Sequence, residues 1–182
     1  MRIIGGTARG RQLKTPSGND IRPTSDKVRL AIFNALFSRG GVAGQVVLDG
    51  FCGTGALGLE ALSQGAVKCY FFDKSQVSLA LAKENAHNLA FEKDSVFTLK
   101  DITKIGTRSA DIPAINIPFL DPPYRQNLIP QALKALSDGQ WFAEDAMIIA
   151  EMEREVNIMT PFPLLLDKEY GDTRVCFFRY QM

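Results

Sequence analysis

Histidine and cysteine are scarce in this chain of 182 residues, which holds one histidine and three cysteines. The cysteines, Cys52, Cys69 and Cys176, are too few and too far apart for a disulfide framework or a Cys-x-x-Cys metal site. A single histidine, His87, also argues against zinc chemistry and a Ser-His-Asp triad. We therefore expect no metal site, and the scattered cysteines favour a reducing cytoplasm.

Long apolar runs are missing as well. No stretch approaches the roughly 20 residues that a membrane-spanning helix needs, and the first six residues lack the apolar core of a signal peptide. Hydrophobic residues make up 46% of the chain and charged residues 23%, a mixture that excludes a disordered or fibrous protein. We expect a cytoplasmic protein without membrane contact, and a monomer, because no dimerisation helix is evident.

Charge is unevenly distributed, although the net charge is only +1. Residues 1–40 hold eight basic and two acidic side chains, whereas the rest of the chain holds 13 basic and 18 acidic ones. The eight basic residues are Arg2, Arg9, Arg11, Lys14, Arg22, Lys27, Arg29 and Arg39. Glycines and few bulky apolar residues lie among them, so the segment predicts a poor core and a surface for nucleic-acid phosphates. A solvated surface of mixed charge is the alternative.

The N-terminal region predicts a small unit of its own. Residues 2–15 are typical of two short strands around a turn at residues 5–10, that is, a β-hairpin. A linker follows, so we divide the chain into a basic hairpin and linker (1–20) and a main domain (21–182). Thr24 or Ser25 can cap a helix that continues to about Ser38.

Strands and helices then alternate along the main domain. Strands are expected at residues 45–49, 67–72, 95–99, 115–120 and 146–151, and helices at 56–64, 77–89 and 128–136. Two last strands, 164–170 and 174–180, leave no room for a helix between them and should pair antiparallel. The expected fold class is α/β and Rossmann-like, with a mostly parallel seven-stranded sheet, antiparallel C-terminal strands and helices on both faces.

A glycine-rich turn follows the first of these strands. Gly53, Gly55 and Gly58 satisfy Gly-x-Gly-x-x-Gly, and Asp73 lies 20 residues beyond Gly53, so a dinucleotide site is one interpretation. Asp49, however, ends the strand where a pyrophosphate would pass, and its carboxylate suits a sulfonium or an ammonium group instead. A turn that merely caps the next helix is the structural alternative.

A second motif, Asp121-Pro122-Pro123-Tyr124, follows the fourth strand. The prolines fix the backbone and leave the carbonyl of the Asp121–Pro122 unit rigidly aimed. A carboxylate, a fixed carbonyl and an aromatic ring suit a planar base with an exocyclic amine: the two oxygens accept the amine hydrogens and Tyr124 stacks on the base. An ordinary turn after a strand is the alternative.

Together these motifs resemble the S-adenosylmethionine-dependent amino-methyltransferases. Further signatures resemble the RsmD family, bacterial 16S ribosomal RNA guanine-N2 methyltransferases, over nearly the whole chain; they lie at residues 2–11, 21–29, 58–62 and 170–174. Two departures stand out. Asp73 replaces the more usual glutamate, which shortens its reach to a ribose, and residues 103–114 diverge without an assigned contact.

The resemblance implies S-adenosylmethionine as cofactor and 16S ribosomal RNA as partner, either naked or within the assembled small subunit. The implied cofactor-binding residues are Asp49, Phe51, Gly53, Gly55, Asp73, Lys74, Asp101 and Ile102. The implied catalytic residues are Asp121, Pro122, Pro123 and Tyr124, and the residues assigned to RNA are Arg2, Arg9, Arg11 and Arg22. For Asp101, a helix cap is the competing interpretation.

Three other functions remain open at this stage. One is an adenine-N6 methyltransferase acting on RNA or DNA, since the DPPY motif is shared with such enzymes. Another is an NAD-binding Rossmann oxidoreductase, which would make no use of Asp49 or of the DPPY motif. A third is an RNA-binding protein without activity, which the intact Asp121–Tyr124 motif disfavours.

Overall fold

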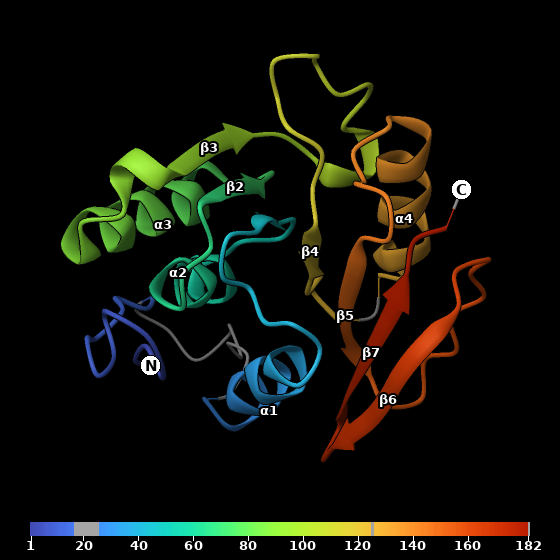
Figure 1. Ribbon diagram of the computed structural model, residues 1–182, viewed down its shortest axis with the longest axis horizontal. Coiled ribbons are helices and arrows are strands. Elements are labelled where there is room, and N and C mark those ends of the chain that lie inside the picture. Colours follow the sequence, from blue (N-terminus) through green and yellow to red (C-terminus); the bar gives the residue numbers. More distant parts are fainter. Residues whose placement is uncertain (17–25, 125, 182) are drawn as a thin grey trace.

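The computed structural model describes residues 1–16, 26–124 and 126–181, and it contains one sheet of seven strands in the order β3-β2-β1-β4-β5-β7-β6. The strands are β1 (Val46–Asp49), β2 (Lys68–Asp73), β3 (Ser95–Leu99), β4 (Ile117–Leu120), β5 (Met147–Glu153), β6 (Leu164–Tyr170) and β7 (Thr173–Arg179). Figure 1 shows them as a twisted sheet that runs from β3 at one edge to β6 at the other.

The pairing confirms the expected fold class. Strand β1 pairs in parallel with β2 on one side and β4 on the other, and β4 pairs in parallel with β5. Strand β7 is antiparallel to both β5 and β6. Only Gly171 and Asp172 separate it from β6, a connection that is too short for anything but an antiparallel hairpin. Strand order reverses between β1 and β4, so the crevice outside their carboxyl ends is where this architecture binds ligands.

Helices cover both faces of the sheet, as expected (Figure 1). The helices are α1 (Asp26–Phe37), α2 (Ala56–Ser63), α3 (Gln76–Leu89) and α4 (Leu128–Asp138). One core packs α1, α2 and α3 against alternate strand residues such as Val47 and Phe71. The other packs α4 against the intervening residues, such as Leu48 and Tyr70. Period-two alternation along buried strands thus supplies two cores from one sheet.

Element boundaries differ from the sequence predictions by no more than two residues. The largest difference at a strand start is in β4, which begins at Ile117 because Ile115 instead makes an isolated parallel bridge with Phe142. The cap expected at Thr24 or Ser25 lies outside the described residues. Within the described part of the chain, no helix is long and apolar enough to cross a membrane.

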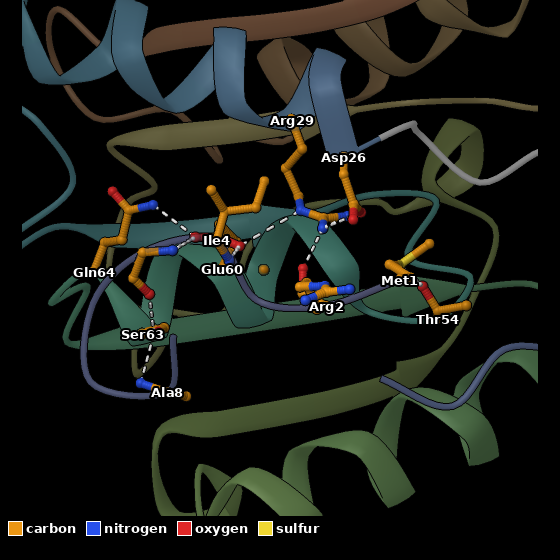
Figure 2. A network of polar contacts seen from close by, with 12 residues as sticks. Met1, Arg2, Ile4, Ala8, Asp26, Arg29, Thr54, Glu60, Ser63 and Gln64 are labelled. Atoms are coloured by element: carbon orange, nitrogen blue, oxygen red, sulfur yellow. Dashed lines mark hydrogen bonds and ion pairs between the residues drawn. The ribbon is translucent and has the colours of Figure 1, made fainter. Parts of the chain in front are cut away.

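The N-terminal hairpin prediction was confirmed in its antiparallel pairing and wrong in the extent of its strands. Residues 1–13, which we call the N-terminal arm, form one isolated antiparallel bridge, Arg2–Gln12, instead of two strands. The two halves of the arm pair through their backbones: Ile3 N–H donates to the Arg11 carbonyl at 2.9 Å and Leu13 N–H to the Met1 carbonyl at 3.1 Å. The arm lies on α2, whose side chains accept from other N–H groups of the arm. Both Ile4 N–H and Gly5 N–H donate to the Glu60 carboxylate at 2.8 Å. Figure 2 shows Ile4 of the arm beside Glu60.

The prediction of a poor core in this basic segment was also wrong. Ile3, Ala8 and Leu13 are buried in the core beneath α1 and α2. Arg29, counted among the residues of a phosphate-facing surface, is fully buried, and its guanidinium lies 3.5 Å from the equally buried carboxylate of Glu60. The arm is therefore an integral layer of the domain.

Candidate active site

A cavity of about 440 Å³ lies at the carboxyl ends of the central strands. Its walls are the turns that follow β1, β2, β3 and β4, together with Glu151 near the end of β5 and Met1 of the arm. The cavity spans the reversal of strand order between β1 and β4, where parallel α/β sheets bind their ligands. The predicted residues that line it are Asp49, Phe51, Gly53, Asp73, Lys74, Asp101, Ile102, Asp121, Pro122, Pro123 and Tyr124.

The three glycines after β1 have different roles. Gly53 lines the cavity and adopts a positive φ of 52°. Gly55, predicted to bind cofactor, does not line it; it precedes α2 with a φ of 79°, and a Cβ there would approach Ala82 and Leu59 to 3.2 Å. Gly58 serves packing, since a Cβ would lie 2.3 Å from the Phe71 ring. Close helix–strand packing is the usual role of the third glycine in this pattern.

Asp49 is buried at the base of the cavity and caps α2. Its Oδ2 accepts a hydrogen bond from the Gly58 N–H at 3.0 Å, which serves a helix whose own N-cap, Gly55, has no side chain. Burial raises the pKa of this carboxyl to about 7; the Gly58 hydrogen bond opposes the rise, and the charges of Asp121 and Asp73 add to it. A bound cation would favour the ionised form, so this position suits a positively charged ligand.

Asp73, at the end of β2, ties the glycine turn to the neighbouring strand. Its Oδ2 accepts from Gly53 N–H at 3.0 Å and its Oδ1 from Ser75 N–H at 2.8 Å. Lys74 follows it on the cavity wall. Both contacts orient the carboxylate beside the turn, where its oxygens are available to ligand hydroxyl groups.

Asp101 caps a short helix and also lines the cavity. It caps the short 3₁₀ helix η2 (Ile102–Lys104) by accepting from Thr103 N–H at 2.9 Å and Thr103 Oγ1 at 2.7 Å, both at Oδ1. The Thr103 hydroxyl bond is the main reason why the pKa of Asp101 lies below its usual value. The same residue lines the cavity with Ile102, whose side chain is buried.

The Asp121–Tyr124 motif lines the cavity after β4, the strand next to the one that leads into the glycine turn. Tyr124 is 36% exposed, and its hydroxyl lies 2.7 Å from Thr173 Oγ1 at the start of β7. Partial burial raises the pKa of Tyr124, the Thr173 hydrogen bond opposes this, and the charges of neighbouring carboxylates raise it further. A second cavity, of about 740 Å³, begins on the far side of this motif and shares Pro122, Pro123 and Tyr124 with the first.

Several residues that line the first cavity were missed by the sequence predictions. Glu151 had a usable signal, because it stands at the end of a predicted strand. Lys100 and Thr54 adjoin predicted residues and could have been found by the same rule. Met1 gave no local signal: it comes from the arm and receives a contact of 3.7 Å from Thr54 Oγ1 at its sulfur.

Three of the four residues assigned to RNA lie on the arm. Arg2, Arg9 and Arg11 are exposed, and the Arg11 guanidinium also donates to the Asn88 carbonyl of α3. Arg22 falls outside the described residues. Within residues 1–16, 26–124 and 126–181, no group of three or more histidine, cysteine, aspartate or glutamate side chains is placed to hold a metal ion.

Comparison with known proteins bears on the whole chain. A family model described as "Conserved hypothetical protein 95" matches residues 1–179. The protein named ribosomal RNA small subunit methyltransferase D of Escherichia coli strain K12 is 34% identical over 100% of this chain and 89% of its own length. Its namesake in Haemophilus influenzae is 32% identical, over 100% of this chain and 93% of that protein.

Solved structures agree in fold. The yhhF protein of Escherichia coli superposes with a TM-score of 0.83 at 32% identity, covering 98% of this chain and 97% of that one. An RNA methyltransferase of Salinibacter ruber, solved in complex with S-adenosylhomocysteine, shares the fold at a TM-score of 0.64 and 14% identity, covering 87% and 93%. With a family model over nearly its full length and relatives above 30% identity, this chain belongs to the RsmD family that its motifs resemble.

Proposed function

We propose that this protein transfers a methyl group from S-adenosylmethionine to the exocyclic N2 amine of a guanine in small-subunit ribosomal RNA. One observation carries the proposal: a single cavity holds both the glycine turn with Asp49 and Asp73 and the Asp121–Tyr124 motif. The names of the relatives, ribosomal RNA small subunit methyltransferase D, support both the reaction and the class of RNA.

The residues around the glycine turn fit a cationic cofactor. The carboxylates on the cavity wall outnumber the two lysines; they are Asp49, Asp73, Asp101, Asp121 and Glu151. Asp49, with its raised pKa, gains most from a positive charge nearby, such as the ammonium or sulfonium group of S-adenosylmethionine. Asp73 would accept from ribose hydroxyls and Asp101 from the adenine amine, with Ile102 against the ring.

When bound, S-adenosylmethionine supplies an electrophilic methyl group on a positively charged sulfur. Asp121 and the carbonyl of the Asp121–Pro122 unit would accept the two hydrogens of the guanine amine and aim its lone pair at that carbon. As the N–C bond forms and the S–C bond breaks, positive charge develops on the nitrogen, and Asp121 stabilises it. The methylated ammonium then loses a proton to water or to Asp121. Tyr124 would replace the stacking that the base loses when it leaves its helix.

The exposed arginines of the arm would bind the phosphates of the RNA. Arg2, Arg9 and Arg11 stand on a layer that packs directly on α2, the helix that begins at the cofactor turn. We also assign Arg22 to the RNA phosphates, on the basis of its position in the basic N-terminal sequence. We propose a monomer that acts in the cytoplasm, on 16S ribosomal RNA either naked or in the small subunit.

Methylation of unmodified small-subunit RNA tests the proposal. The purified protein is incubated with S-adenosylmethionine and either naked 16S RNA transcript or reconstituted small subunits, and the RNA is digested to nucleosides for mass spectrometry. N2-methylguanosine is expected. N6-methyladenosine would overturn the guanine assignment. Absence of any methylated nucleoside with both substrates would overturn the activity. Calorimetry adds a second check: binding of NAD in place of S-adenosylmethionine would favour the oxidoreductase alternative.

A further inference from the structure

Glu151 is a buried carboxylate in the candidate active site to which the proposed reaction gives no task. Its side chain is 4% exposed and lines the same cavity as Asp121 and Tyr124. Glu151 interacts with at least one group within the protein, which offsets part of the cost of its burial. Its place beside the acceptor-binding motif also puts it where a bound substrate can bring further donors.

The strand register fixes where Glu151 stands. Strands β4 and β5 are parallel, and the last registered pair is Leu120 with Ala150. The residues that follow this pair are Asp121, directly after β4, and Glu151, still within β5. The two carboxylates therefore occupy adjacent positions at the same edge of the sheet. The charges of both carboxylates, together with that of Glu153, add to the rise that burial causes in the pKa of Tyr124. Glu151 therefore lies beside the group that holds the acceptor amine.

Two adjacent carboxylates match the hydrogen-bonding edge of only some bases. Guanine presents two neighbouring donors, the N2 amine and N1–H. Adenine and cytosine also carry an exocyclic amine, but their ring nitrogen next to it is an acceptor. If such a base bound here, the lone pair of its ring nitrogen would face the second carboxylate. Two acceptors facing each other in a buried site cost binding free energy. A carboxylate has about four acceptor sites, so Glu151 can keep a partner within the protein and still accept from a base.

We infer that Glu151 accepts the N1–H of the target guanine while Asp121 holds its N2 amine, which makes Glu151 a specificity residue of this site. The inference rests on the proposed function and deepens it, because it names the chemical feature by which guanine is selected over bases with an acceptor beside the amine. A site built to satisfy a donor rejects analogues that lack the donor far more strongly than a site that reads shape alone.

The test replaces the target guanine, once mapped, with 2-aminopurine, which keeps the N2 amine and turns N1 into an acceptor. For each enzyme, kcat/KM is measured on both RNAs, and the guanine-to-aminopurine ratio is compared between the wild type and Glu151→Gln. The intrinsic reactivity of each base is the same for both enzymes, so it cancels in this comparison. A glutamine amide can turn its NH2 toward N1 of 2-aminopurine. The ratio should fall by about tenfold or more, the scale of one good base contact.

Glu153→Gln is the matched control, since Glu153 stands two residues further along β5 and lines only the neighbouring cavity. Its ratio should equal that of the wild type. Equal binding of S-adenosylmethionine by the wild type and Glu151→Gln shows that the variant is folded. If Glu151→Gln does not fold, Glu151→Asp replaces it in the test. This variant should show a lower kcat/KM for the guanine RNA and no higher kcat/KM for the 2-aminopurine RNA.

An unchanged ratio in Glu151→Gln, with wild-type N2-methylation of guanine, would overturn the role of Glu151 alone. A wild type that forms no N2-methylguanosine would overturn the proposed function itself. The two failures are therefore read from different measurements.

Discussion

Arg29 of α1 and Glu60 of α2 form an ion pair that is closed to solvent on both sides. The Arg29 Nε lies 3.5 Å from Glu60 Oε2, and neither side chain has any exposed surface. Arg29 also donates to the Arg2 carbonyl and to Asp26, while Glu60 accepts from the backbone of the arm (Figure 2). The pair therefore joins α1, α2 and the arm at one point.

Removing the Glu60 carboxylate should strongly destabilise the protein. Glu60→Ala leaves Arg29 as a buried cation and takes the acceptor from two backbone N–H groups, so the free energy of unfolding should fall by about 3–5 kcal/mol. Urea unfolding followed by circular dichroism measures this. Glu84→Ala is the control: Glu84 pairs with Lys14 on the surface, and its loss should cost about 1 kcal/mol or less. Equal losses in the two variants would contradict the structural role of the buried pair.

The raised pKa of Asp49 predicts a pH-dependent affinity for S-adenosylmethionine. With a pKa of about 7 in the free protein, the carboxyl is mostly protonated at pH 6 and mostly ionised at pH 8. Because only the ionised form attracts the cation, affinity should rise about tenfold between these pH values. Calorimetry measures the dissociation constants. Asp49→Asn keeps an acceptor for Gly58 N–H and should bind weakly at both pH values; a wild type with the same flat profile would refute the prediction.

The same group should lower stability as pH rises in the absence of ligand. The folded pKa lies above the ordinary aspartate value of 3.8, so between pH 4 and 7 the folded state holds a proton that the unfolded state has lost. The Asp49 contribution to the free energy of unfolding therefore decreases with pH through this window. Measuring the free energy of unfolding of the wild type and of Asp49→Asn from pH 4.5 to 7.5 isolates this contribution. If the two free energies changed with pH in parallel, the raised pKa of Asp49 would be contradicted.

The strand ends were predictable from sequence, whereas the tertiary contacts of the arm were not. Asp49, Asp73 and Asp121 each directly end or follow a hydrophobic run, and parallel topology brings such positions to one edge of the sheet. The burial of Arg29 depends on Glu60, which lies 31 residues away in sequence and on another helix. No local sequence pattern encodes that pairing. The sequence alone therefore cannot distinguish a buried arginine from an exposed one that binds phosphate.

The glycine turn shows the same limit within the site. Gly-x-Gly-x-x-Gly predicts a tight turn correctly, but it does not say which glycine faces a ligand. In the structure Gly53 faces the cavity, while Gly55 and Gly58 face neighbouring side chains. Only the packing of α2 against α3 and β2 distinguishes them.

Gly58→Ala should destabilise the protein through the contact with β2. The new methyl group would lie 2.3 Å from the Phe71 ring and 2.5 Å from Cys69 Sγ, so α2 must shift outward, at a cost of about 1–3 kcal/mol. A double-mutant cycle with Phe71→Leu checks the cause. The double variant should lose less free energy of unfolding than the two single losses combined, and strict additivity would place the strain elsewhere.

Asp121→Ala should slow methyl transfer while leaving cofactor binding within a few-fold of the wild type. Loss of the acceptor that holds the amine and stabilises its developing charge should lower kcat by about 10²–10³-fold. Single-turnover assays with saturating S-adenosylmethionine measure the step. Asp121→Asn keeps an acceptor without the charge, so its kcat should lie between those of the wild type and Asp121→Ala. Full activity of Asp121→Ala, with the cofactor bound, would rule out the role given to this carboxylate.

Replacement of the exposed arm arginines should weaken RNA binding without changing its sequence preference. Arg9→Ala removes one phosphate contact, so the slope of log K against log salt should become shallower by about one unit. Lys134→Ala removes the same charge from α4, where the lysine pairs with Asp138 at 2.6 Å, and should leave the slope unchanged. Titration of labelled 16S RNA fragments at several salt concentrations measures both. If Arg9→Ala and Lys134→Ala gave the same slope as the wild type, the arm would be a structural layer over α2 and the RNA surface would lie elsewhere.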